Sequence, residues 1–213
     1  MAIKAPPSEN KPFELVPAGN HVARCYRVLH IGTVPEKYLG EERMMNKVVI
    51  GFELPNEMRE FKEGEGEKPF AIFKEYTLSM FEKASLYKLV TGIIGKPLTE
   101  EEANNFQIES LIGQTCLLNV IHKIGKESGK ERAEIQSAAP LPKGMEAPAP
   151  FNKPQILDYE NWDEGLFESL PEFLKEKVMS SLEYAQHINP TPADESHIEA
   201  VEASGLNPDD IPF

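Results

Sequence analysis

Alternating apolar and polar residues predict five short β-strands within the first two thirds of the chain. In segment 21–31 the apolar residues Ala23, Cys25, Leu29 and Ile31 lie at odd positions, while Arg24 and Tyr26 lie at even positions. Because side chains two residues apart on a strand point to the same face, this pattern predicts one buried and one exposed face. Similar patterns predict further strands at 47–54, 70–78, 115–124 and 132–138.

A change to helical spacing predicts two helices between the third and fourth strands. Apolar residues recur every three or four positions through 86–94, as on the buried face of a helix. The S-x-x-E pattern at 79–82 predicts a capping box before this helix, and Gly95 is typical of a helix end. A second such pattern, T-x-x-E at 99–102, predicts a shorter helix that ends near Phe106.

Five short strands with an inserted helix suit a small β-barrel better than an open sheet. An open sheet of short strands exposes unpaired edges, and closure into a barrel removes them. We therefore expect a mainly β fold: a closed or nearly closed five-stranded barrel with a helix between strands three and four, followed by a C-terminal helical arm and a disordered acidic tail.

The last third of the chain differs in composition from the barrel. Five prolines within 139–154 predict a semi-rigid linker, and the apolar spacing over 170–185 predicts one more helix. From Asn189 onward too few apolar residues remain to form a core, so this segment is expected to be disordered. The resulting division is a flexible lead-in at 1–18, a barrel domain at 19–140, a linker at 141–156, a helical arm at 157–188 and a tail at 189–213.

Charge is distributed unevenly along the 213 residues, whose net charge is −13. Residues 1–143 hold 19 Lys and Arg against 20 Asp and Glu, a net charge of −1. Residues 144–213 hold 3 Lys against 15 Asp and Glu, a net charge of −12. A nearly neutral domain joined to a strongly acidic segment is typical of a domain with an interaction tail.

Cellular location and redox state can be inferred from features that the sequence lacks. It contains no apolar run of about 18 residues and no signal-peptide core, so we expect a cytoplasmic protein without a membrane partner. Cys25 and Cys116 each lie in an apolar strand and have no CxxC spacing, which predicts buried, reduced thiols.

The C-terminal tip carries the most specific motif. Asp209, Asp210, Ile211, Pro212 and Phe213 resemble the acidic tip of bacterial single-stranded DNA-binding proteins. Pro212 keeps the end extended, Ile211 and Phe213 are apolar anchors, and the acidic groups suit a basic pocket. The resemblance implies that this tip docks on partner proteins that act in replication, recombination or repair.

The barrel pattern of residues 19–140 separately resembles the OB-fold single-stranded DNA-binding proteins of some bacteriophages. The chain lacks the long Gly- and Gln-rich linker of the bacterial proteins and adds the helix at 170–185, which fits a bacteriophage-type relative better. This resemblance implies an OB-type barrel that binds single-stranded DNA with little sequence specificity.

A surface for single-stranded DNA needs cations for the phosphates and aromatic rings for the bases. Two predicted strands each carry a cation and a tyrosine two residues apart, so that both point to one face. Lysines also open the second strand and flank the last hairpin, a loop that OB-folds use for nucleic acids. Phe52 and Phe73 are expected in the core. The expected DNA-binding residues are Arg24, Tyr26, Lys47, Lys74, Tyr76, Lys123, Lys126 and Lys130.

No catalytic or cofactor motif is complete in this sequence. Segment 92–97, GIIGKP, ends like a phosphate-binding loop but has Pro97 where that loop needs Ser or Thr. His187 and His197 lack metal-ligand spacing, so we expect no enzyme activity, no cofactor and no metal. The alternative function is a protein-interaction adaptor, or a nucleic-acid-mimicking inhibitor, built on the barrel. The sequence leaves open whether the chain forms a homo-oligomer.

Overall fold

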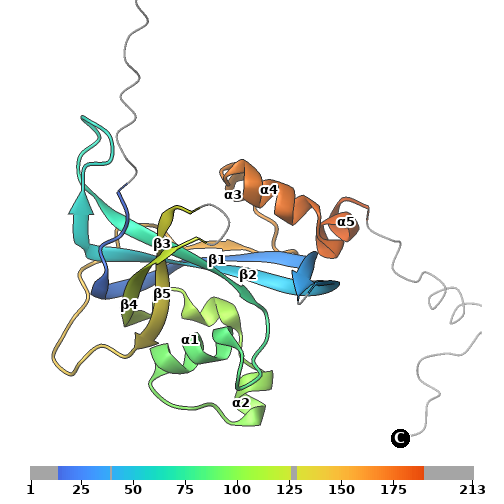
Figure 1. The fold of residues 1–213 in the computed structure, drawn as a ribbon, viewed down its shortest axis with the longest axis horizontal. Helices are drawn as coiled ribbons and strands as arrows, with labels where there is room; N and C mark the ends of the chain where they lie inside the picture. The colour runs from blue at the N-terminus through green and yellow to red at the C-terminus, as the bar shows by residue number, and fades with distance from the viewer. Residues whose placement is uncertain (1–13, 39, 126–128, 190–213) are drawn as a thin grey trace, which may run out of the picture.

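Six strands form one sheet in the computed structural model, which describes residues 14–38, 40–125 and 129–189 (Figure 1). Five of them pair antiparallel in the order β3-β2-β1-β4-β5, and β6 pairs parallel with β1. The strands are β1 (Gly19–Tyr38), β2 (Glu41–Arg59), β3 (Lys68–Thr77), β4 (Thr115–Ile124), β5 (Glu131–Ala139) and β6 (Gln155–Leu157). The expected mainly β fold is confirmed.

The hairpin of β1 and β2 is longer than the sequence pattern indicated. The polar stretch 35–43, expected to separate two strands, forms the outer end of this hairpin, where Tyr38 pairs with Glu41. Polar residues are compatible with strands there because this end of β2 is exposed to solvent. Alternation of apolar and polar residues therefore marked only the part of each strand that faces a core.

Bulges in β1 change which of its residues face inward. The register with β2 shifts twice, first at Tyr26. A bulge adds one residue and reverses the alternation beyond it. Consequently Ala23 and Cys25 face the main core, whereas Leu29 and Ile31 face the opposite side of the sheet, toward the C-terminal helices. The prediction that these four residues share one face is wrong.

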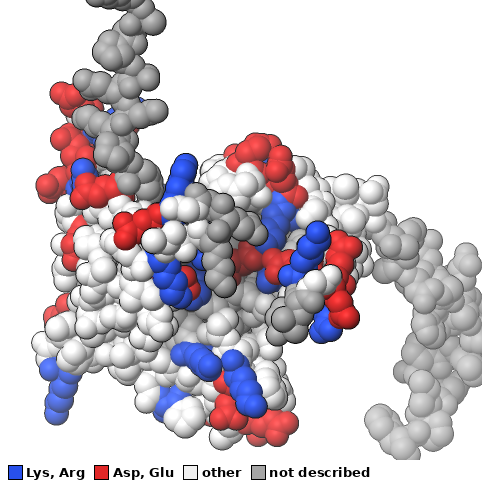
Figure 2. All heavy atoms as spheres, viewed as in Figure 1, with Lys and Arg blue, Asp and Glu red and all other residues white. Residues whose placement is uncertain are grey.

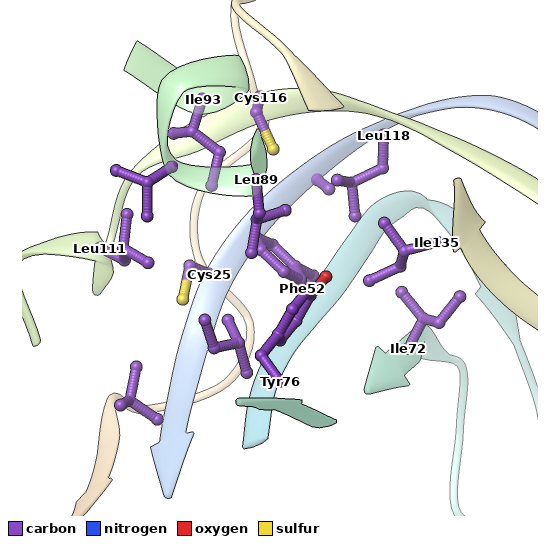
Figure 3. Close-up of a cluster of buried hydrophobic side chains, with 14 of the residues drawn as sticks. Cys25, Phe52, Ile72, Tyr76, Leu89, Ile93, Leu111, Cys116, Leu118 and Ile135 are labelled. Atoms are coloured by element: carbon purple, nitrogen blue, oxygen red, sulfur yellow. The ribbon is translucent and has the colours of Figure 1, made fainter. Parts of the chain in front are cut away.

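The main core fills the inside of the curved sheet and is covered at one end by α1 (Ser85–Ile94). Figure 3 shows side chains from β2, β3, β4 and α1 converging there, among them Phe52, Tyr76, Leu89 and Leu118. Gly95 ends α1 in the left-handed conformation, as expected. The expected capping box before α1 is wrong, because the helix begins at Ser85 and its N-cap makes no side-chain hydrogen bond.

Two short helical turns follow α1 before the chain returns to the sheet. α2 (Glu100–Asn104) begins with the predicted capping box, in which Thr99 Oγ1 accepts from Glu102 N at 3.1 Å and Glu102 Oε2 accepts from Thr99 N at 2.8 Å. The 3-10 helix η1 (Ile108–Leu111) then places Ile108 and Leu111 against the main core. The expected shorter helix is thus confirmed, although it ends before Phe106.

The sheet curves toward a barrel but its outer strands, β3 and β5, are not paired. The expected closed five-stranded barrel is therefore not confirmed. Lys74 on β3 bridges the gap instead: its Nζ donates to the Ile135 carbonyl at 2.7 Å and lies 3.5 Å from Glu134 Oε1. A side chain thus connects the two edges where strand hydrogen bonds are absent.

The C-terminal helices pack on the outer face of β1 and β2, on the side of the sheet opposite α1 (Figure 1). They are α3 (Glu164–Glu168), α4 (Glu172–Met179) and α5 (Leu182–Ile188). The single helix expected over 170–185 is wrong, because Ser181 starts a new helix by accepting a hydrogen bond from Tyr184 N. A second core lies between these helices and the sheet, formed by Leu29, Ile31, Val34, Val49, Leu157, Leu166, Phe167, Leu170 and Val178.

Contacts at a β1 glycine join α5 closely to the sheet. Gly32 has a φ of +93°, and a Cβ there would lie 2.7 Å from Ser181 Cβ, so only glycine permits this approach. Beside it, Thr33 donates its N–H and its hydroxyl to the Glu183 carboxylate, at 2.5 and 2.7 Å. The helical arm is therefore part of the folded unit.

Among the residues described, no helix is long and apolar enough to span a membrane.

Candidate nucleic-acid interface

The two faces of β3 are the reverse of those expected. Tyr76 is only 3% exposed and lies in the main core, whereas Phe73 is 43% exposed on the outer face. Phe70, Ile72 and Tyr76 alternate along the inner face, and burial raises the pKa of the Tyr76 hydroxyl. Assigning Tyr76 to the surface and Phe73 to the core was wrong, because a tyrosine hydroxyl is tolerated at the edge of a core.

Arg24 and Tyr26 also contact other residues of the protein. Tyr26 is buried next to the bulge, and its ring meets the ring of Phe73 edge-on at a centroid distance of 6.1 Å. Burial raises the pKa of Tyr26, and the nearby Arg27 acts in the opposite direction. Arg24 pairs with the buried carboxylate of Glu53 at 3.5 Å. Neither side chain lies on an exposed outer face, where both were expected.

Lys47 and Lys74 are engaged within the protein. Lys47 is buried and lies 2.6 Å from Glu36 and 3.8 Å from Glu75, two carboxylates that also bind Lys177 of α4. Burial acts to raise the pKa of Glu36, but hydrogen bonds from Lys47 and Lys177 outweigh it and lower that pKa. Lys47 therefore connects the sheet to the arm, just as Lys74 connects β3 to β5.

The β4–β5 hairpin keeps two expected cations at the surface. Lys123 is exposed and lies 3.2 Å from Glu134, and Lys130 is exposed just before β5. Lys126 and the tip residues, Asp209, Asp210, Ile211, Pro212 and Phe213, lie outside the described residues.

A groove that the sequence pattern did not predict is lined by five aromatic side chains. We call it the aromatic groove; its volume is about 480 Å³. Its walls come from segment 14–16, β3, β5 and segment 151–152, which are far apart in the sequence. Phe61 and Phe70 meet edge-on at 5.0 Å, and Phe73 contacts Tyr26 as described. The aromatic residues that line the groove are Tyr26, Phe61, Phe70, Phe73 and Phe151.

Phe73 is held flat on the sheet by its neighbours. A Cβ at Gly51, its partner on β2, would lie 2.6 Å from two carbon atoms of the Phe73 ring. The absence of that Cβ is what lets the ring lie over the β2 backbone. The Arg27 guanidinium lies 5.1 Å from the Phe73 ring centroid and 5.5 Å from that of Tyr26. One side of the groove is thus a fixed aromatic surface with a cation against it.

Further cations line the groove. Lys68 and Arg132 both contribute to its walls and are exposed. Lys68 lies 2.6 Å from Glu65, and Arg132 lies 3.8 Å from Glu134. Exposed ion pairs of this kind contribute only about 0–1 kcal/mol, so a phosphate can replace the carboxylate partner. On the face shown in Figure 2, Lys and Arg lie in small groups among Asp and Glu rather than in one basic patch.

The C-terminal end of the segment that was expected to be a linker forms part of the groove wall. We call residues 151–155 the strap. Glu53 accepts hydrogen bonds from Phe151 N at 3.2 Å and from Asn152 N and Nδ2, both at 2.8 Å. Gln155 Oε1 then accepts from Arg27 Nε at 2.5 Å, where β6 begins. The strap thereby orders both Phe151 and the cation that lies against Phe73.

A larger cleft of about 1020 Å³ lies between α1, α2 and the segment before α1. Leu78, Met80, Leu98 and Phe106 pack against the main core from its floor. Its charged lining residues are Glu82, Glu100 and Glu109, with no Lys or Arg among the described residues that form it. This charge disfavours a nucleic-acid backbone and leaves the aromatic groove as the better candidate.

No protein-family model matches the chain, and no curated protein matches its sequence. The described part of the chain contains no group of three or more His, Cys, Asp or Glu that could hold a metal ion.

Proposed function

We propose that this protein binds single-stranded DNA in the aromatic groove, with little sequence specificity, on a barrel of the OB type. The observation that carries the proposal is a groove in which the exposed rings of Phe61, Phe73 and Phe151 lie together, with Arg27, Lys68 and Arg132 in or beside it. Aromatic rings stack on unpaired bases of any sequence, and cations neutralise the phosphates between them.

The strand order supports an OB-type barrel. OB folds are five-stranded, partly open barrels that bind oligonucleotides on the face of strands 2 and 3 and at the loops after strands 1 and 4. Here Phe73 of β3 lies over Gly51 of β2, on that face. The loop after β4 is flanked by Lys123, near the end of β4, and by Lys130, just before β5. The aromatic groove and these lysines are therefore where such a fold would receive a strand.

The binding energy would come from stacking as well as charge. Each stacked base contributes roughly 1–3 kcal/mol, so two stacks suffice for roughly 2–6 kcal/mol before phosphate contacts. The near-neutral charge of residues 1–143 limits the electrostatic part. We therefore expect affinity to fall with rising salt, but less steeply than for a protein with a continuous basic surface.

The direct test is fluorescence anisotropy with labelled oligo-dT, compared with a duplex of the same length. Stacking requires unpaired bases, so the single strand should bind more tightly, and the recovered oligonucleotide should be intact. Equal affinity for both, or no binding at low salt, contradicts the proposal.

The acidic tip would supply a second activity, the recruitment of partner proteins in replication, recombination or repair. Its support is the sequence Asp209–Phe213 and the net charge of −12 over residues 144–213. The second candidate function is a protein-interaction adaptor, which the cleft with Glu82, Glu100 and Glu109 favours. An adaptor would show no preference for oligo-dT in the anisotropy test.

A further inference from the structure

Glu53 occupies an unusual position for a carboxylate. It is 0% exposed, lies on β2 between β1 and β3, and accepts the hydrogen bonds of Phe151 and Asn152 while pairing with Arg24. Burying a charged group costs free energy, and even a well-paired buried charge adds little net stability compared with an apolar residue. General stabilisation of the sheet is therefore a poor explanation for Glu53, whereas the position of the strap depends directly on it.

The strap has few other attachments ahead of β6. No residue between 140 and 156 is buried, so this segment gains little from packing. Phe151 itself is 52% exposed, with its ring at the wall of the aromatic groove. On the N-terminal side of Gln155, which binds Arg27, the strap is attached to the sheet by its hydrogen bonds to Glu53.

We propose that Glu53 is a positioning residue for DNA: it holds Phe151 over the groove so that a base is clamped between the strap and the sheet. This inference rests on the proposed function and extends it to a residue that does not touch the strand. Phe73 lies over Gly51 on the sheet side, and Phe151 is held by Glu53 on the strap side. A bound base between them is restrained from two directions, which slows its release.

The test uses Phe151→Trp as a reporter in the full chain. The native sequence has one tryptophan, Trp162, which packs in the second core against Phe167 and Tyr184, away from the groove. Oligo-dT should quench the new tryptophan by stacking on it. Adding Glu53→Gln should remove most of that quenching and increase acrylamide quenching of the DNA-free protein, because the strap is released.

Dissociation rates give the second measurement. Glu53→Gln and Phe151→Ala should each raise the dissociation rate from oligo-dT, by about fivefold to 150-fold for the loss of one base stack. Asn152→Ala removes one of the three hydrogen bonds to Glu53 and should raise the rate less. The slope of affinity against salt should stay unchanged because no exposed cation is removed. Glu75→Gln is the matched control, a sheet carboxylate that binds Lys47 and Lys177 instead, and it should leave the rate as in the wild type.

Each outcome supports or overturns the inference. If Phe151→Ala raises the rate but Asn152→Ala and Glu53→Gln do not, Glu53 does not position the ring. If Phe151→Ala has no effect while Phe73→Ala weakens binding, the groove binds DNA without the strap, and only this inference fails. If the wild type does not bind oligo-dT, both proposals fail. Should Glu53→Gln melt far below the wild type, Asn152→Ala and Phe151→Ala decide the question.

Discussion

Replacing Gly51 by alanine should separate DNA binding from folding. The added Cβ would lie 2.6 Å from the Phe73 ring and 3.1 Å from Arg27 Cβ, whereas unstrained carbon contacts begin near 3.4 Å. The ring must therefore move by nearly 1 Å or rotate away from β2. Because Phe73 is an exposed side chain, it can move at little cost to the fold. Alanine also costs less backbone entropy than glycine in a strand.

The expected result is weaker binding of oligo-dT with little change in thermal stability. Displacing one stacking surface should cost about 1–2 kcal/mol, or fivefold to thirtyfold in Kd. The assay is anisotropy with labelled oligo-dT beside a melting curve. Phe73→Ala provides the control: in that background Gly51→Ala should have no further effect, since the two changes act on one ring. Unchanged affinity in Gly51→Ala, or an equal loss in both backgrounds, refutes the reasoning.

Three further predictions concern Tyr76 in the main core, the ion pair of Glu36, and the C-terminal residues 207–213. Tyr76→Ala should lower the free energy of unfolding by about 3–5 kcal/mol, as for other large core side chains, measured by urea denaturation; unchanged stability contradicts its core position. Because the folded-state pKa of Glu36 is lowered, its pairing with Lys47 stabilises the fold above the unfolded pKa, near 4.5. This contribution should be lost as pH falls through the folded-state pKa, and Glu36→Gln should flatten the acid side of the stability curve. Deleting residues 207–213 should leave oligo-dT affinity unchanged or tighter at low salt and abolish partner binding in pull-downs. Loss of DNA binding would instead assign the tail to the DNA site.

Much of the fold could be predicted because apolar spacing records burial. Strand positions near 47–54 and 115–124, the α1 stripe and the Thr99 capping box all match the structure. The bulge at Tyr26 could not be predicted, since one extra residue reverses a strand face without changing the local composition. The extent of the β1–β2 hairpin was missed for a related reason, because its outer end has no core to face.

The candidate site was harder to predict than the fold. The expected pairs of a cation and a tyrosine were chosen from spacing alone, and the structure assigns Tyr76 to the core and Lys47 to a charge cluster. The groove instead combines segments that lie far apart in the sequence, from Glu14 to Asn152. A local signal did exist: Phe61 lies in a charged loop and Phe151 in a Pro-rich segment, where an isolated aromatic residue has no core to enter.

Ultraviolet cross-linking of the protein to oligo-dT, mapped by mass spectrometry, is the most direct test of DNA binding in the aromatic groove. Irradiation joins bases to the aromatic side chains on which they stack. Binding in the groove predicts adducts on Phe61, Phe73 or Phe151, and none on Tyr76. Adducts confined to Phe81 at the acidic cleft, or no adduct under conditions where oligo-dT binds, would contradict it.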